Sequence, residues 1–304
     1  GLSTTLPALL ACRLLLGCGS SAALAGSGAY LADITTRVPN QRAKIIGFQS
    51  TVINVAYAAG PAIGGYLCDL YGARLMFFIV GGGAAICSGG FYLLPEPRKI
   101  AAVAEIGETK PGDEKKEDTT WSVYRPLLAD PNQQGLMMMN FAVFCSYSAL
   151  MTVFPLHAAE VLGANGTASV IGSLFASGAM IGFVGAPLGG YLADKFGRKN
   201  TVVPAGVLIS IGALMTTLTT AETASVSTML PAILVWGLGN SMANPGLSAF
   251  AADIAKDVKT RSQALSLSRM AQDSAFLLCP ITLGALAQFY SCSTALFSSA
   301  GIIT

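Results

Sequence analysis

Residues 64–72, GGYLCDLYG, recur as residues 189–197, GGYLADKFG, with six of the nine residues unchanged. Each copy ends a long apolar stretch, which begins near residue 45 in the first case and near residue 169 in the second. The second copy runs directly into Arg198 and Lys199, after which another apolar stretch begins. This repeated junction predicts a chain that is built from duplicated sets of apolar segments.

The composition of the 304-residue chain is dominated by these apolar segments. Hydrophobic residues make up 53% of the chain and charged residues 11%, whereas a soluble domain carries about 25% charged residues. A large share of the charge is concentrated between residues 96 and 130. These proportions exclude a soluble enzyme, a disordered protein and a nucleic-acid binder, and they predict a polytopic membrane protein.

Eight apolar stretches approach the roughly 20 residues that a helix needs to cross a bilayer core of about 30 Å. Because backbone groups in lipid must be hydrogen-bonded within the protein, we expect each stretch to form an α-helix. A ninth stretch, Cys292–Thr304, is cut short. The eight predicted spans are Leu6–Leu31, Ile45–Leu67, Leu75–Leu94, Gly135–Leu156, Ser169–Leu192, Thr201–Leu218, Met229–Ala251 and Leu265–Phe289.

Lysine and arginine residues gather in alternate short connections. The connections after the first, fifth and seventh spans contain nine of them, and the alternate connections contain only Arg74. The positive-inside rule therefore predicts that the nine-residue side is cytoplasmic, together with the charged linker 95–133. The sequon Asn165-Gly166-Thr167 then falls on the outer side.

A second set of repeats sets the number of helices. Glycine, serine and Ala-Asp positions of the first two spans reappear about 220 residues later, in the seventh and eighth spans. The period is therefore six helices, whereas the repeat of residues 64–72 relates the second and fifth spans on opposite membrane faces. Parallel six-helix halves that contain inverted three-helix units are the architecture of one large class of transporters.

We therefore expect twelve helices in the intact molecule. Residues 1–94 would form the second half of the first bundle, residues 95–133 the linker, and residues 134–304 the second bundle with its last span truncated. On this interpretation the chain is a fragment that lacks the first three helices and most of the last one.

The segment GYLADKFGRK at residues 190–199 is similar to the cytoplasmic loop signature of the major facilitator superfamily. It is the strongest of several matches, and the resemblance to that family runs along the whole chain. The carboxylate of Asp194 can accept hydrogen bonds from a neighbouring helix N-terminus or from Arg198, which would latch the cytoplasmic side in one state. Alternatively, the segment is a turn without a latching role that only supplies positive charge to the cytoplasmic side. The signature positions are Gly190, Asp194, Gly197, Arg198 and Lys199.

The sequence GPAIGG at residues 60–65 resembles a motif of the drug:proton antiporter branch of the family. Pro61 removes a backbone donor and the glycines permit bending and close packing, so Gly60, Pro61, Gly64 and Gly65 predict a gating kink. A packing motif without bearing on transport direction is the alternative. The family pattern has a glycine four residues earlier, where this chain has Ala56.

Charged residues inside predicted spans point to a coupling site, since such residues face a cavity or a partner. Arg13 opens RLLLGCG at residues 13–19, which resembles a family motif whose arginine is linked to proton coupling; the usual glutamine is Leu16 here. A structural role is the alternative for Arg13. Asp273 lies near mid-span and four residues from Arg269, so it is either a proton carrier or cation binder, or the partner of Arg269 in a salt bridge.

Polar and aromatic residues within the spans are candidates for the substrate cavity, although each also suits ordinary packing. We place His157 and Glu160 at the outer mouth of the fourth span, where loop chemistry explains them. The single histidine and the scattered cysteines predict no metal site. The cavity candidates are Asn54, Tyr57, Asn140, Tyr147, Trp236 and Asn240.

The leading interpretation is a secondary active transporter that works by alternating access. The resemblance implies proton-coupled export of small organic molecules such as drug-like or amine compounds, with the proton gradient as energy source and no cofactor. One alternative is a facilitator or symporter for sugars or other metabolites, and another is a transporter-like receptor that moves nothing. We expect a monomer in the lipid bilayer that binds a small-molecule substrate and no nucleic acid, and we do not expect an enzyme.

Overall fold

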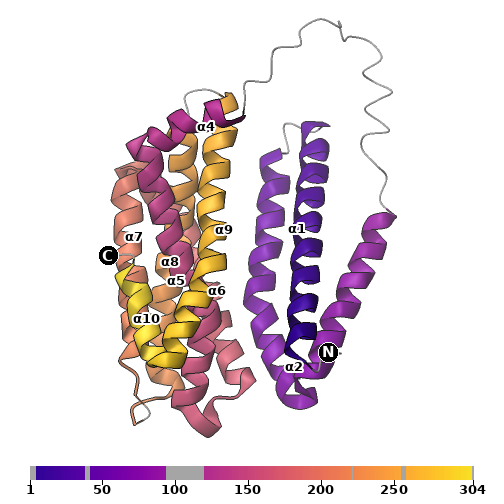
Figure 1. Cartoon of the computed structure of the whole chain (residues 1–304), viewed down its shortest axis with the longest axis vertical. Coiled ribbons are helices and arrows are strands. Elements are labelled where there is room, and N and C mark those ends of the chain that lie inside the picture. The colour runs from indigo at the N-terminus through magenta and orange to yellow at the C-terminus, as the bar shows by residue number, and fades with distance from the viewer. Residues whose placement is uncertain (1–4, 38–41, 94–119, 221, 255–257, 303–304) are drawn as a thin grey trace, which may run out of the picture. The chain divides into compact units, whose positions relative to one another are not determined.

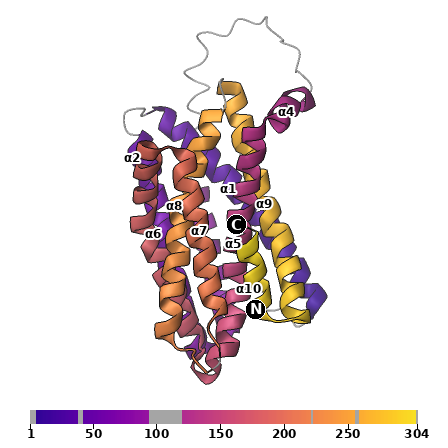
Figure 2. The same ribbon diagram turned by 90° about the vertical axis from the view of Figure 1, so that its left-hand side faces the viewer.

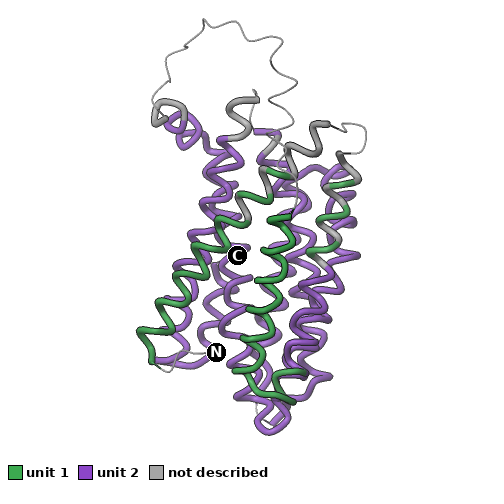
Figure 3. The backbone as a smooth tube through the Cα atoms, turned by 90° about the vertical axis from the view of Figure 1, so that its right-hand side faces the viewer, with its two compact units in different colours: residues 1–53, 67–115 green, residues 54–66, 116–304 purple. Residues whose placement is uncertain are grey.

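The long apolar stretches fold into long α-helices in the computed structural model, which describes residues 5–37, 42–93, 120–220, 222–254 and 258–302 (Figure 1). No strand occurs within these ranges. Seven of the helical segments are long and apolar enough to cross a membrane, by length and composition. The chain divides into two compact units, residues 1–53 with 67–115 and residues 54–66 with 116–304 (Figure 3).

The first unit contains α1 (Leu6–Arg37) and most of α2 (Arg42–Tyr92). The apolar windows of both helices have no residue buried within the protein. The apolar part of α2, Val55–Tyr92, would be about 57 Å long at 1.5 Å per residue, which far exceeds a bilayer core. It is interrupted at Gly72, where φ is 80° and ψ is 156°, so α2 comprises the second and third predicted spans.

The second unit is a helical bundle in which α5 to α10 run side by side (Figures 1 and 2). The most extensive packing joins α7 to α8, α6 to α8 and α5 to α9, and α10 contacts α5, α7 and α9. The helices of the second unit are α4 (Thr120–Ala129), α5 (Pro131–Leu162), η2 (Gly163–Asn165), α6 (Ala168–Phe196), α7 (Arg198–Thr217), α8 (Val226–Ile254), α9 (Val258–Phe289) and α10 (Cys292–Gly301).

Polar side chains fix the ends of several of these helices. Asp130 precedes α5 and its carboxylate accepts a hydrogen bond from the Asn132 backbone N–H, while Thr167 caps α6 through the Val170 N–H. Ser291 caps α10 in the same way. These side-chain oxygens satisfy donors that the first helical turn leaves unpaired.

The core of the second unit is made of apolar side chains from α5 to α10, together with small residues that permit close approach. Trp236 on α8, Phe154 on α5 and Leu174 on α6 are among its fully buried members. Gly212 on α7 makes room for Trp236, because a Cβ at this position would lie 2.5 Å from the Trp236 backbone nitrogen. Small residues at helix contacts are typical of membrane bundles.

The eight predicted spans all fall on helices, which confirms the all-α polytopic fold. The structure adds two details to the predicted segments. The last part of the predicted linker is helical, since α4 covers Thr120–Ala129 and α5 begins at Pro131, whereas residues 94–119 lie outside the described ranges. Residues 54–66 also belong to the second compact unit, and the division at residues 94 and 134 stays a prediction.

Candidate functional site

The GPAIGG segment of α2 packs against α6 within the second unit. A methyl group on Gly172 of α6 would overlap the carbonyl of Pro61, and one on Gly65 would overlap the carbonyl of Ala168. The two helices are therefore in backbone contact at both positions, which only residues without a Cβ permit. Gly60 lies in open space and Gly64 is half-buried, so the close contact depends on Gly65 and Gly172.

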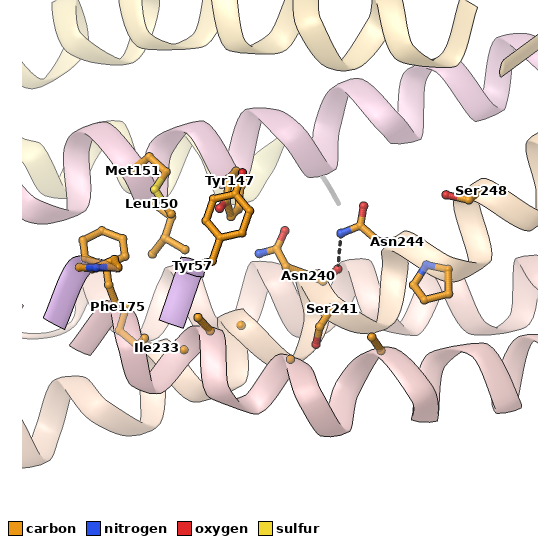
Figure 4. A pocket seen from close by; sticks show the side chains of 17 residues that line it. Tyr57, Tyr147, Leu150, Met151, Phe175, Ile233, Asn240, Ser241, Asn244 and Ser248 are labelled. Atoms are coloured by element: carbon orange, nitrogen blue, oxygen red, sulfur yellow. Dashed lines mark hydrogen bonds between the residues drawn. The ribbon is translucent and has the colours of Figure 1, made fainter. Parts of the chain in front are cut away.

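A cavity of about 460 Å³ lies beside this contact. Its walls come from residues 54–66 of α2 and from α5, α6 and α8, all within the second unit (Figure 4). The volume suits a small organic molecule, because ligand pockets are typically about 300–1,000 Å³. The lining residues that Figure 4 labels are Tyr57, Tyr147, Leu150, Met151, Phe175, Ile233, Asn240, Ser241, Asn244 and Ser248.

Aromatic and amide side chains give the cavity its chemical character. The amide of Asn240 donates to the Trp236 carbonyl at 3.1 Å, and the amide of Asn244 donates to the Asn240 carbonyl at 2.9 Å. Both side chains are thereby oriented one turn apart along α8 (Figure 4). The lining residues include no charged side chain. The site can therefore stack an aromatic ring and hydrogen-bond a polar substituent, while its walls are mostly apolar.

An aromatic cluster joins Tyr147 on α5 to Phe276 on α9. The ring of Phe276 on α9 lies 6.0 Å from the Tyr147 ring and 5.6 Å from the Phe144 ring, in both cases edge to face. Phe144 and Tyr147 are also in edge contact at 6.4 Å. These contacts hold the Tyr147 ring at the cavity wall by a geometry that aromatic pairs favour.

The structure brings three of the predicted cavity residues together and places two elsewhere. Tyr57, Tyr147 and Asn240 line the cavity. Trp236 is fully buried behind it, where its indole N–H donates to the Ser146 hydroxyl at 2.8 Å. Trp236 therefore anchors the packing of α8 on α5 and does not line the cavity.

Asn140 also belongs to the helix packing. Its side-chain oxygen accepts a hydrogen bond of 2.7 Å from Gln272, and its amide nitrogen donates to the Leu136 carbonyl at 2.9 Å. This connection ties α5 to α9 away from the cavity lining. The side chain of Asn54 lies outside the described part of the chain.

Neither of the charged residues within the α9 span, Arg269 and Asp273, lines the cavity. Arg269 and Asp273 form the predicted pair along α9, with Arg269 Nε 3.4 Å from Asp273 Oδ1 and with 61% and 64% of the two side chains exposed. Asp273 is therefore a paired carboxylate on an open face of α9, and it is not buried. Arg13 is exposed on α1 in the first unit.

The loop signature forms an ion-paired junction between three helices. Arg198 at the start of α7 binds Asp194 at the end of α6, which is the contact that the sequence predicts. Arg198 Nε also lies 3.2 Å from Asp253 Oδ2 on α8. Gly197 has φ 96° and ψ 154° at the turn between α6 and α7, a conformation that is essentially restricted to glycine.

Two residues that join helices in the second unit are absent from the sequence prediction. Asp253 stands in the Ala252-Asp253 position of the long repeat, but the repeat alone does not show that its carboxylate reaches Arg198. Gln272 had no motif around it. Both contacts depend on how α8 and α9 pack against the other helices of the second unit.

The expectation for His157 was wrong. The imidazole is buried, with 2% of the residue exposed, and Nε2 lies 3.1 Å from the Thr216 carbonyl on α7. The reason is that α5 extends to Leu162, more than a turn past His157, so that this position faces the helix bundle.

Among the described residues, no group of three metal-binding side chains occurs.

Comparisons with known proteins agree with this architecture. Multidrug resistance protein 1 of Bacillus subtilis (strain 168) is 32% identical to this chain over 113 residues, which cover 37% of this chain and 28% of that protein. Multidrug resistance protein 2 of the same organism is 23% identical over 84% of this chain and 60% of its own length. The citrate-proton symporter of Klebsiella pneumoniae is 27% identical over 78% of this chain and 53% of its length. The chain thus spans at most 60% of these relatives.

A solved structure shows the same fold. The crystal structure of a bacterial homologue of the human lysosomal transporter Spinster, in an inward-facing and unoccupied conformation, superimposes with a TM-score of 0.53. The match covers 87% of this chain and 67% of the other at 14% sequence identity. The model of the Major Facilitator Superfamily matches residues 1–218 and residues 136–304. The chain is a multi-pass membrane protein and belongs to the Major Facilitator Superfamily.

Proposed function

We propose that the full-length protein is a secondary active transporter that moves small organic molecules by alternating access. The observation that carries the proposal is the cavity of about 460 Å³ between residues 54–66 of α2 and helices α5, α6 and α8. It lies within helices that are long and apolar enough to span a membrane, where a site near the bilayer midplane is typical of transporters.

The lining of the cavity favours an aromatic or otherwise lipophilic substrate. Tyr57, Tyr147 and Phe175 offer ring surfaces, and Asn240 and Asn244 offer amide groups. A polyanion such as citrate would be poorly matched to this lining, because buried charge needs a charged or well-bonded partner. The likeness to two multidrug resistance proteins supports the same choice, and proton-coupled export is the direction that we propose.

Asp273 on α9 is the candidate carrier of the coupled proton, and Arg269 is the group that controls the charge of Asp273. The pair is 3.4 Å apart and open on one face, so a proton that reaches this face can compete with Arg269 for the carboxylate. A carboxylate within a membrane-spanning helix is a functional candidate for this reason. Arg13 is the second candidate, on the strength of its motif.

A facilitator or symporter of metabolites is the second candidate function. The observation that favours it is the likeness to the citrate-proton symporter, which covers 78% of this chain. In that case the substrate would move with the proton or without it, and the cavity would be used for uptake.

The test uses the full-length protein in sealed vesicles with a pH-sensitive dye trapped inside. A proton gradient is imposed, and lipophilic cations, aromatic amines, sugars and organic acids are added one at a time. We expect aromatic amines or lipophilic cations to evoke proton movement, and Asp273→Asn to abolish it while the substrate still binds. Ser274→Ala, one residue further along α9, is the matched control and should transport as the parent does.

Each contrary result has a defined meaning. Substrate flux without proton movement, unchanged in Asp273→Asn, would support the facilitator and reduce Asp273 to the partner of Arg269. Flux of sugars or organic acids alone would support the metabolite carrier. Binding without any flux would support the transporter-like receptor.

A further inference from the structure

A second cavity, of about 280 Å³, lies at the end of the bundle where α5 and α7 begin and α8 ends. It is separate from the substrate cavity and shares none of its lining residues. Its deeper wall is apolar, with Leu136 and Met139 from α5, Val202 from α7 and Leu247 from α8. We refer to this cavity as the α5–α7 crevice.

The α5–α7 crevice runs along the helices rather than across them. Met139 lies eight residues after Pro131, the first residue of α5, so the crevice reaches about 12 Å from the helix start. Val203 on its wall is 61% exposed, and Met138, which precedes the wall residue Met139 in the chain, is 73% exposed. Apolar side chains that are exposed on a membrane-spanning helix face acyl chains, so the crevice is continuous with a lipid-facing surface.

The mouth of the crevice carries a cation without a carboxylate partner among the described residues. The ammonium of Lys199 lies 3.5 Å from the side-chain oxygen of Asn132 and 5.6 Å from the centre of the Phe250 ring. Its neighbour Arg198, by contrast, is held by Asp194 and Asp253. An amide oxygen and a ring orient the Lys199 ammonium but leave its charge uncompensated.

The backbone at the mouth adds to the positive potential. The helix α7 has Gly197 at its N-cap, with no side-chain hydrogen bond to the first turn. Its 20 residues place a partial positive charge at this end. The lining of the α5–α7 crevice therefore combines a lysine and an uncapped helix N-terminus with apolar side chains.

We propose that the α5–α7 crevice binds one anionic glycerophospholipid of the adjacent leaflet. An acyl chain fills the apolar channel, and the phosphate of the headgroup lies beside Lys199 and the start of α7. Both halves of the site match this ligand, because a basic pocket between helices complements the headgroup and the apolar wall complements the chain. A free phosphate would satisfy only the mouth and would leave the channel unfilled.

The experiment places a reporter in the crevice of the full-length protein. Phe250→Trp supplies the reporter, and the unsubstituted protein gives the background of the native tryptophans. The protein is reconstituted in phosphatidylcholine vesicles that contain a small fraction of either dibrominated phosphatidylglycerol or dibrominated phosphatidylcholine. Quenching by each lipid, measured as its fraction rises, gives the relative association constant of the anionic over the zwitterionic lipid.

We expect phosphatidylglycerol to associate about fivefold more strongly, the contribution of one lysine near a charged headgroup. Lys199→Gln should bring the ratio close to one. Lys195→Gln is the matched control, because its ammonium lies over the rings of Tyr191 and Phe196, outside the crevice. Gly135→Leu, at a wall position with open space, should remove quenching by both lipids.

The proposal is overturned if Lys195→Gln lowers the ratio as much as Lys199→Gln, since the preference would then be a general surface-charge effect. It is also overturned if Lys199→Gln leaves the ratio unchanged. Displacement of the brominated lipid by soluble glycerol phosphate would identify a free anion as the occupant. Quenching that depends on the protein-to-lipid ratio alone would show that a second copy of the protein covers the crevice. Thermal unfolding of each variant confirms that it is folded.

Discussion

Arg198 on α7 and Asp253 on α8 are joined by an ion pair of 3.2 Å, although 55 residues separate them in the chain. Arg198 binds Asp194 at the same time, so one guanidinium connects the ends of three helices. The side chain of Arg198 is 28% exposed, whereas those of Asp194 and Asp253 are 74% and 58% exposed. Exposed ion pairs contribute about 0–1 kcal/mol each, so this junction adds little to stability.

The first prediction concerns the function of that junction. Arg198→Gln removes both ion pairs and should change the thermal stability little, because the pairs are open to solvent. If the pairs hold one conformational state of the protein, as an alternating-access transporter would require, their loss should still shift the balance of states by roughly fivefold. The measurement compares thermal unfolding with the labelling rate of an introduced cysteine in the cavity. Lys195→Gln, which removes a nearby charge outside the junction, should alter neither quantity; equal effects of the two variants would contradict the prediction.

The second prediction concerns the contact between α2 and α6. Gly172→Val forces a side chain against the Pro61 carbonyl and should destabilise the protein by about 1–3 kcal/mol, the usual cost of overpacking. Because the contact borders the cavity that we propose to bind substrate, transport by the full-length protein should fall as well. Gly60→Val lies one residue from Pro61 but in open space, so its melting temperature should stay near that of the parent. A stable Gly172→Val protein would mean that the helices separate without cost.

The third prediction distinguishes the buried tryptophan from the cavity residues. Trp236→Phe loses the hydrogen bond to Ser146 and leaves a buried hydroxyl without its donor, which should cost about 1–3 kcal/mol of stability. The apparent affinity for substrate should hardly change. Tyr57→Leu, at a cavity residue that is 60% exposed, should do the opposite, lowering affinity by about tenfold through loss of ring contact while unfolding at nearly the same temperature. Equilibrium substrate binding and thermal unfolding of both variants test this contrast.

The fourth prediction concerns the turn at Gly197. Its φ of 96° and ψ of 154° are strained for any side chain, so Gly197→Ala should destabilise the protein by about 1–3 kcal/mol. Gly190→Ala is the control on the preceding helix, since its added Cβ would meet its nearest neighbour, on Pro245, at an ordinary 4.0 Å. Chemical or thermal unfolding of the two alanine variants should differ accordingly. Equal stability would show that the turn relaxes to accept a side chain.

The sequence predicts the helices well because their cause is local. A run of apolar residues in lipid must be helical, so all eight predicted spans are found on helices. The Arg198–Asp194 and Arg269–Asp273 pairs were also predictable, since residues four apart share a helical face or span a short turn.

The site is harder to predict because it depends on contacts between distant helices. Trp236 and Asn240 lie four residues apart on α8, yet one is buried against α5 and the other lines the cavity. A single sequence does not record which side of α8 faces α5. The same reason explains His157, whose burial follows from the position of α7, and Asp253, whose partner is 55 residues away.

The two copies of the repeated junction have nearly the same backbone. Gly72 has φ 80° and ψ 156°, and Gly197 has φ 96° and ψ 154°. Yet the residue after Gly72 is Ala73, whereas the residue after Gly197 is Arg198. In the first copy the arginine comes one residue later, as Arg74, so the turn does not require an arginine directly after its glycine. The two junctions share a backbone shape but place the arginine differently along the chain, which means that the position of the charge can move by one residue while the glycine that the turn requires is kept.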